Sequence, residues 1–268
     1  MRLEKWILVI IVCFALVAPS EGDDGWMPQS GNEMGLSNKS VQMVREHIRI
    51  TVYNRHLHAV CDFIFLNHGK PTKLTMGFPD FCDPGDSQKQ VSFNQNDLYH
   101  FHSWVNGKEV VTRLVRNPRE IWDSFWFEKQ VSFRKGEEIW VRDSYDMPIG
   151  LEDISWSVKK GKYIQWTCHN LSYVIRTGST WFGNIENAEI DVRFSTPGVL
   201  SPYLLHRGEV DFEKTNAKGI SEIIPTSHDI WYNWNGFVDQ RNNELIFKKR
   251  NFKPTYKDDL FLSFKFPI

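Results

Sequence analysis

AEIDVRF, residues 188–194, alternates apolar and charged side chains without interruption. The apolar set is Ile190, Val192 and Phe194, and the charged set is Glu189, Asp191 and Arg193. Successive side chains of a β-strand point to opposite faces, so this stretch predicts a strand with one buried and one solvated face. Such strands are typical of antiparallel sheets that pack on a core through a single face.

The same alternation recurs along the chain. It is found in HIRITVYN (47–54) and in DDLFLSFKFPI (258–268). Asn106-Gly107 and Lys135-Gly136 each separate two apolar flanks, which predicts two hairpins. Helical periodicity is weak throughout, and we expect at most a turn or two of helix near residues 41–47.

These patterns predict an all-β fold, an antiparallel β-sandwich made of two packed β-sandwich regions. The first region covers residues 40–155, and the second covers residues 160–268, after the charged stretch SVKKGKY. An alternative is that the second region extends the first instead of folding alone. Residues 23–40 are rich in Gly, Ser and Asn and predict an irregular lead-in.

The amino-terminal segment indicates export. Two basic residues precede an unbroken apolar run, Ile7–Ala18. A membrane-spanning helix needs roughly 20 apolar residues, so this run is short for an anchor and suits a signal peptide, residues 1–22. The sequence thus predicts a secreted or cell-envelope protein with no transmembrane segment in its mature chain.

Charge and cysteine content argue against several classes of protein. The chain has 32 basic and 33 acidic residues, so electrostatics give no case for a nucleic acid partner or an anionic membrane surface. It has 4 cysteines, one of them in the signal segment, too few for a disulfide framework. A Cys61–Cys82 bond is possible, and plain buried thiols are the alternative.

Motifs for catalysis are missing. The chain has no G-x-S-x-G elbow, no glycine-rich phosphate loop and no H-E-x-x-H helix. We therefore predict no catalytic residue and no cofactor, although a site assembled from distant residues leaves no such trace.

Two histidine pairs are the best candidates for a site assembled from residues that are distant in the sequence. His56 with His58, and His100 with His102, stand two residues apart, and on a strand each pair shares a face. No third-ligand spacing accompanies either pair, so we predict no metal site.

Aromatic residues make up 14% of the chain, and they suggest a binding surface. Trp122 and Trp126 share a face of one expected strand, and Trp231 and Trp234 cluster in another. These four are the predicted ligand-binding residues, because exposed aromatic rings stack on sugars or anchor protein partners. The alternative, which the surrounding alternation favours, places these rings in the core.

The stretch TGSTWFG (177–183) predicts a tight connection with a structural role, here called the Trp181 corner. It joins two strands, its glycines permit unusual backbone angles, and Trp181 is large enough to fill a gap in the core.

Four motifs occur in order along the chain: DDGWMP (23–28), NHGKPTKLTMGFP (67–79), TGSTWFGNI (177–185) and NFKPTYKDD (251–259). The ordered set resembles a family of secreted bacterial proteins known only as a domain of unknown function. The resemblance implies export and a β-rich body, and it brings no catalytic residues to carry over.

The sequence as a whole predicts an exported, non-catalytic β-sandwich that binds a protein or glycan of the cell envelope or extracellular space. Two alternatives stay open. One is a metal-dependent or other hydrolase with a site assembled from distant residues, and the other is a carrier of a small apolar ligand.

Overall fold

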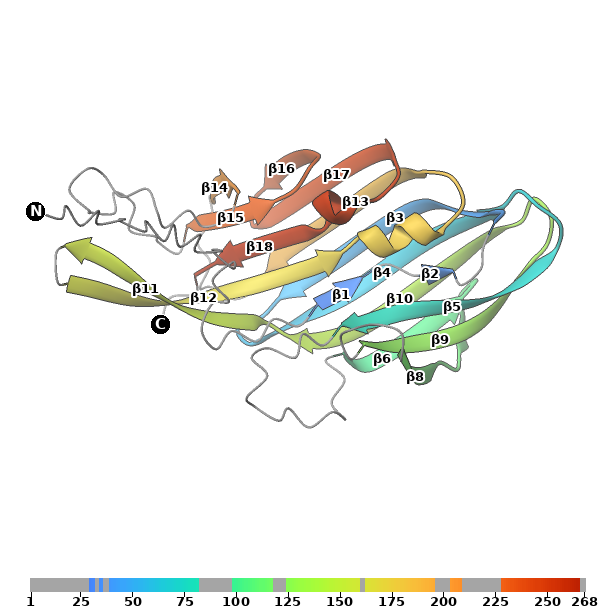
Figure 1. The fold of residues 1–268 in the computed structure, drawn as a ribbon, viewed down its shortest axis with the longest axis horizontal. Helices are drawn as coiled ribbons and strands as arrows, with labels where there is room; N and C mark the ends of the chain where they lie inside the picture. Colours follow the sequence, from blue (N-terminus) through green and yellow to red (C-terminus); the bar gives the residue numbers. More distant parts are fainter. Residues whose placement is uncertain are drawn as a thin grey trace, which may run out of the picture.

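The computed structural model confirms the all-β prediction. It describes residues 29–31, 34–35, 39–81, 98–117, 124–159, 162–195, 203–208 and 228–265. The predicted signal peptide lies outside the described residues, and so do Trp122 and Cys82. The described strands form two sheets (Figure 1).

The larger sheet, sheet A, has ten strands. Its main path runs β14 (Leu204–Arg207), β15 (Asp229–Asn233), β18 (Leu260–Phe264), β12 (Lys162–Val174), β1 (Gln29–Gly31), β5 (Thr72–Phe81), β9 (Ser124–Phe133) and β8 (Arg113–Asn117). Off this path, β11 (Gly150–Lys159) pairs with β12, and β2 (Met34–Gly35) pairs with β5.

Sheet B has eight strands. Its order is β16 (Phe237–Arg241), β17 (Glu244–Phe252), β13 (Ile185–Phe194), β3 (Val41–Val52), β4 (His56–Asn67), β10 (Glu138–Pro148), β6 (Tyr99–Val105) and β7 (Lys108–Val110). Two short 3-10 helices, η1 (Arg176–Thr180) and η2 (Tyr256–Asp258), lie between strands.

Strands from both predicted regions share each sheet, which supports the alternative that the second region extends the first. In sheet B, β13 pairs in parallel with β3. In sheet A, β1 from the predicted irregular lead-in pairs with both β12 and β5. The expected boundary near residues 155–160 falls within the β11–β12 hairpin.

The alternation predicted for β13 is confirmed. Ile190, Val192 and Phe194 are buried, while the charged residues between them are partly or fully exposed. The hairpin predicted at Asn106-Gly107 also forms, between β6 and β7. Asn106 and Gly107 take φ values of 51° and 77°, the positive values that a two-residue hairpin turn requires. The hairpin predicted at Lys135-Gly136 is wrong, because this turn carries the chain from β9 in sheet A to β10 in sheet B and the two strands do not pair.

The expected helical turn near residues 41–47 is wrong, because this stretch begins β3. A β-bulge lies between Met43 and Arg45, where Val44 has no partner in the register with β4. Before the bulge, Val41 and Met43 face the core; after it, the even-numbered residues do. The bulge breaks the period of two, and this break hides the strand in the sequence.

Aromatic side chains join the two sheets along their length. Phe78 of sheet A lies 5.3 Å from Tyr145 of sheet B, measured between ring centroids. Phe264 of sheet A lies 5.0 Å from Phe194 of sheet B in an edge-on contact. Both members of each pair are buried, so the two sheets enclose a single hydrophobic core.

One ion pair also crosses the core. Lys129 Nζ of β9 donates to both carboxylate oxygens of Asp143 on β10, at 2.9 and 3.1 Å. Both side chains are buried. The Asp143 carboxylate lies beside Cys61, where burial and this negative charge raise the pKa of the thiol well above its usual value. Cys61 and Cys168 are buried thiols, and Cys82, the possible partner of Cys61, lies outside the described residues.

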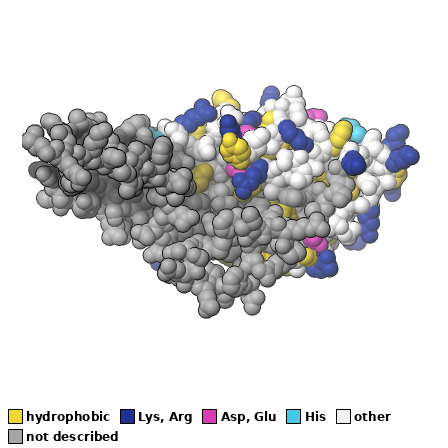
Figure 2. All heavy atoms as spheres, in the orientation of Figure 1, with side chains coloured by type: hydrophobic (Ala, Val, Ile, Leu, Met, Phe, Trp, Pro, Cys, Tyr) yellow, Lys and Arg dark blue, Asp and Glu magenta, His cyan; other side chains and the backbone are white. Residues whose placement is uncertain are grey.

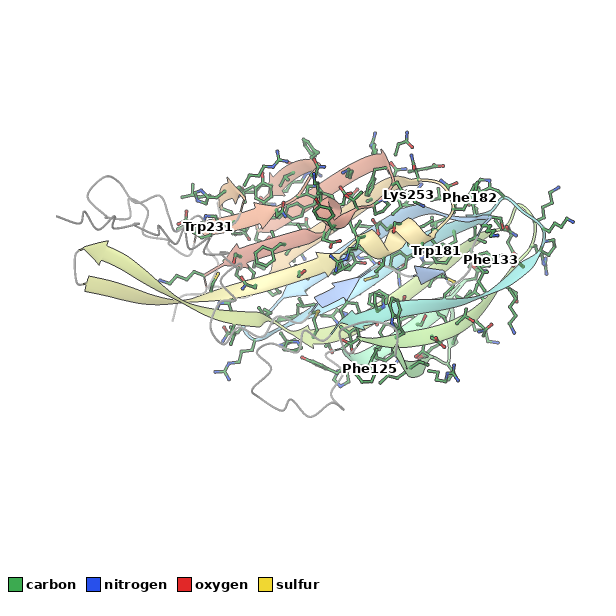
Figure 3. The ribbon with its side chains drawn as sticks, viewed as in Figure 1. Phe125, Phe133, Trp181, Phe182, Trp231 and Lys253 are labelled. Atoms are coloured by element: carbon green, nitrogen blue, oxygen red, sulfur yellow. The ribbon has the colours of Figure 1, made fainter. Side chains whose placement is uncertain are left out.

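The predicted corner is confirmed around Trp181. The ring is buried and lies 4.5 Å from the ring of Phe65. Thr180 Oγ1 donates to the carbonyl of Thr177, and Gly183 takes a φ of 68°. Lys253 Nζ donates to the carbonyl oxygens of Trp181 and Gly183, and Figure 3 shows its side chain beside this corner.

We expect Trp181→Ala to lower the free energy of unfolding by about 3–5 kcal/mol, because it leaves a large cavity against Phe65. Thermal and urea denaturation measure the loss. The matched control is Phe182→Ala, since Phe182 is 46% exposed at the next position. This control should cost about 1 kcal/mol or less. Equal effects of the two variants would contradict the structural role of Trp181.

A second prediction concerns the buried ion pair. Lys129→Met leaves the Asp143 carboxylate buried without its cation and should destabilise the fold by about 3–5 kcal/mol. Adding Asp143→Leu should restore most of that loss, since an apolar pair of similar volume avoids the cost of burying charge. Chemical denaturation of both variants tests this, and a double variant as unstable as the single one would contradict it.

Candidate functional site

The described tryptophans among the predicted ligand-binding residues are buried. Trp126 is 7% exposed, Trp231 is 6% exposed and Trp234 is 1% exposed. Trp231 stacks on His206, with ring centroids 5.0 Å apart, and Figure 3 places it far from the Trp181 corner along the long axis. These positions match the core alternative. Ligand contacts by the four tryptophans stay a prediction.

The two histidine pairs lie on the outer face of sheet B but do not converge on one point. Strand β10 separates β4 from β6, and its Asp146 lies between His58 and His100. Both histidines bond this carboxylate through Nδ1, each at 2.8 Å. Burial alone raises the pKa of Asp146, but the hydrogen bonds and charges of His100 and His58 outweigh burial and lower it.

The other two histidines have separate contacts. His102 Nδ1 bonds Glu109 Oε1 at 2.8 Å, and His56 stacks on Tyr53. The paired histidines are therefore structural partners of carboxylates and of an aromatic ring, distributed over two strands, β4 and β6.

A row of charged residues crosses the outer face of sheet B. Neighbouring strands place these residues directly opposite one another in the order Lys248, Glu189, His47, Asp62 and Arg142. Opposite charges at facing positions stabilise neighbouring strands. The row brings residues from both ends of the sequence into one polar surface.

Asp62 is the most heavily bonded member of this row. Its oxygens accept from Arg49 at 2.6 Å, from Arg142 at 2.7 and 3.0 Å, and from the Trp140 indole at 2.9 Å. Burial alone raises the pKa of Asp62, but the hydrogen bonds and charges of Arg142 and Arg49 outweigh burial and hold the pKa below its usual value. The ionised carboxylate fixes the positions of both arginines.

A groove of about 320 Å³ opens on the same face, over β3, β13 and β17. Its charged and polar lining consists of Arg45, Glu46, His47, Asn187, Glu189, Lys248 and Arg250. Asn187 lies directly between Arg45 and Arg250 in the strand register. Its short side chain between two long ones leaves room for a ligand.

Two partly exposed tryptophans on this face escaped the sequence analysis. Trp104 of β6 and Trp140 of β10 each alternate with residues that point into the core. The Arg142 guanidinium lies 4.7 Å from the centroid of the Trp140 ring. Period-two alternation is the signal that finds them, because Ile139 and Val141 on either side are buried.

Figure 2 shows the opposite side of the molecule. Figure 2 shows Lys and Arg side chains scattered over the described part of that face, with hydrophobic atoms in small separate spots. Among the described residues, no helix has the length and apolar character needed to cross a bilayer.

Comparisons with known proteins give a structural likeness alone. No family model matches the chain, and no curated protein matches its sequence. A candidate nutrient-binding protein from Legionella pneumophila subsp. pneumophila str. Philadelphia 1 has a similar solved structure, with a TM-score of 0.62 and 19% identity over 91% of this chain and 73% of that chain. This likeness defines the shared fold.

Weaker likenesses extend to two enzymes. The M1 zinc metallopeptidase from Deinococcus radiodurans gives a TM-score of 0.35 and 10% identity, over 85% of this chain and 43% of that chain. Leukotriene A4 hydrolase from Saccharomyces cerevisiae gives a TM-score of 0.42 and 8% identity, over 84% of this chain and 29% of that chain.

The Asp62 contacts generate a pH-dependent prediction. Asp62→Asn should lower the free energy of unfolding by about 1.5–3 kcal/mol at neutral pH, because the hydrogen bonds lose their charge. The stabilisation by Asp62 is present above the unfolded-state pKa of about 3.9 and is lost as pH falls through the lower folded-state pKa. The stabilities of wild type and variant should therefore converge in acid.

Urea denaturation at a series of pH values measures this convergence. The control is Asp239→Asn, which removes the exposed Asp239–Arg241 pair and should cost about 0.5 kcal/mol or less. A constant difference between wild type and Asp62→Asn down to strong acid would contradict the assigned ionisation.

Proposed function

We propose that this chain is an exported β-sandwich binding module whose groove over β3, β13 and β17 binds an acidic glycan of the cell envelope. The observation that carries the proposal is the Arg45–Asn187–Arg250 row, which places two guanidinium groups on either side of an amide within a groove. A carboxylate between these groups can accept paired hydrogen bonds from arginine and one from the amide.

The charge distribution supports an anionic ligand. Within the part of the chain that the structure describes, neither Arg45 nor Arg250 forms an ion pair, whereas Arg49 and Arg142 are both engaged by Asp62. Arg45 and Arg250 are exposed on strands of a sheet, so their backbone positions are fixed before a ligand arrives. Preorganised donors of this kind lose less entropy on binding than donors on loops.

The dimensions of the surface favour an extended saccharide over a small ion. The row that holds Arg45 and Arg250 continues through Ile64 to Trp140 across five neighbouring strands. Adjacent strands lie about 4.8 Å apart, so the row is about 19 Å long. A chain of several sugars can lie along it, with an acidic sugar at the arginines and a ring near Trp140.

Two further observations fit this role. The signal-like segment 1–22 and the ordered motifs predict export, which brings the module to envelope glycans. The fold is shared with a protein described as a candidate nutrient-binding protein, which is consistent with binding.

The test is binding of acidic and neutral oligosaccharides to the purified chain, first on a glycan array and then by calorimetry. We expect acidic glycans to bind and their neutral counterparts to bind much more weakly. The double variant Arg45→Gln/Arg250→Gln should lower the affinity about tenfold or more. Arg193→Gln is the matched control, because Arg193 is an exposed arginine of β13 outside the groove.

A further expectation is that affinity falls as salt concentration rises, since exposed guanidinium–carboxylate contacts are screened. The proposed site would be overturned if no glycan on the array bound the chain, or if the Arg193→Gln control lost binding to the same extent.

A further inference from the structure

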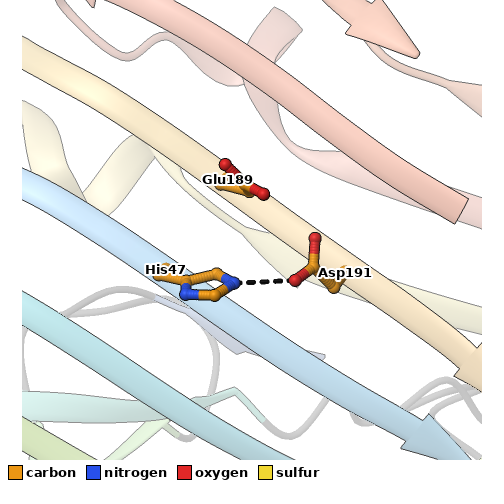
Figure 4. Close-up of side chains that lie close together, drawn as sticks. All are labelled: His47, Glu189 and Asp191. Atoms are coloured by element: carbon orange, nitrogen blue, oxygen red, sulfur yellow. Dashed lines mark hydrogen bonds and ion pairs between the residues drawn. The ribbon is translucent and has the colours of Figure 1, made fainter. Parts of the chain in front are cut away.

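We propose that His47, Glu189 and Asp191 bind a divalent transition-metal ion on the outer face of sheet B. This site goes beyond the proposed glycan binding and does not depend on it. The three side chains come from two parallel strands and point into the same space (Figure 4).

The strand register creates the cluster. His47 of β3 lies directly opposite Glu189 of β13, and Asp191 follows two positions along the same face. One ligand atom from each residue lies within 4.8 Å of those of the other two. Within the described ranges, this is the one such group of three or more histidine, cysteine, aspartate or glutamate side chains. All three are partly buried, which shields the site without closing it.

The donors suit a borderline metal ion. An imidazole nitrogen with two carboxylate oxygens is a ligand set for Zn²⁺ and Mn²⁺, with water completing the coordination shell. The two carboxylates together carry the charge that a dication neutralises. The set lacks the six or more oxygen ligands that Ca²⁺ prefers.

One carboxylate oxygen of Asp191 is available to bind a cation. Its Oδ2 is 2.7 Å from His47 Nε2, and its Oδ1 is buried without a hydrogen-bond partner among the described residues. A buried carboxylate oxygen with no partner is costly, and a bound cation would satisfy it.

The neighbouring arginine leaves Asp191 available. Arg49 faces Asp191 across the parallel pair, yet its guanidinium donates to Asp62 on the other side, at 2.6 Å. Asp62 thus holds a positive charge away from the cluster.

Glu189 is also available, because its present partner can leave. Lys248 Nζ lies 2.9 Å from Glu189 Oε2, and the two side chains are 32% and 36% exposed. An exposed pair of this kind contributes little stability, so the lysine can turn to solvent when a metal ion binds Glu189.

The test is calorimetric titration of the purified chain with Zn²⁺, Mn²⁺, Ca²⁺ and Mg²⁺, without glycan. We expect one equivalent of Zn²⁺ to bind, Mn²⁺ to bind more weakly, and Ca²⁺ and Mg²⁺ to give no measurable heat. Asp191→Asn and Glu189→Gln should each weaken Zn²⁺ binding about tenfold or more, since even the loss of a residue that only hydrogen-bonds to a metal ligand costs that much. Co²⁺ gives an independent readout through its visible absorption, which should be lost in the same variants.

Asp146→Asn is the control, because it disrupts the His58–Asp146–His100 contacts while leaving the proposed ligands intact. It should bind Zn²⁺ as the wild type does. Absence of Zn²⁺ binding in the wild type overturns the proposal, and so does loss of binding in Asp146→Asn with retention in Asp191→Asn. The Arg45→Gln/Arg250→Gln variant should keep Zn²⁺ binding, so failure of the glycan site and failure of the metal site are distinguishable.

Discussion

The parallel pairing of β3 with β13 is the contact on which the rest of the molecule depends. It joins a strand that ends at Val52 to one that begins at Ile185, and so connects β3, β4, β10, β6 and β7 of sheet B to β13, β17 and β16. Parallel strands cannot be connected by a tight turn, and here the intervening chain builds half of the strands of each sheet. The same pairing sets His47 opposite Glu189 and Arg45 opposite Asn187, so the groove and the proposed metal ligands come together only where it forms.

Local structure could be predicted from the sequence because its causes are local. Alternation over a few residues determined which side chains of β13 and β18 face the core. The Asn106-Gly107 turn formed because its two residues tolerate positive φ. The corner at Trp181 followed from glycine, hydroxyl and ring size within one short stretch.

The candidate site could not be predicted, because its causes are long-range. No local pattern indicates that residues 45–49 pair with residues 187–193. The sequence therefore favoured the histidines two residues apart as candidate metal ligands and gave no sign of His47. Tryptophan identity did not distinguish core from surface either. Trp126 and Trp234 are buried, whereas Trp104 and Trp140 are partly exposed, and the difference lies in which face of the strand each occupies.

The β-bulge in β3 also determines which changes of length the strand can accept. Val44 is the residue without a partner, and the residues on either side of it keep their faces in a regular strand that lacks it. Loss of Val44 would leave Met43 inward, Arg45 outward and His47 beside Glu189. Loss of Glu46 would also leave a regular strand with Met43 and Ile48 inward, but it would turn Arg45 towards the core. The position of a deletion relative to the bulge therefore decides whether a charged side chain stays outside or is forced inside.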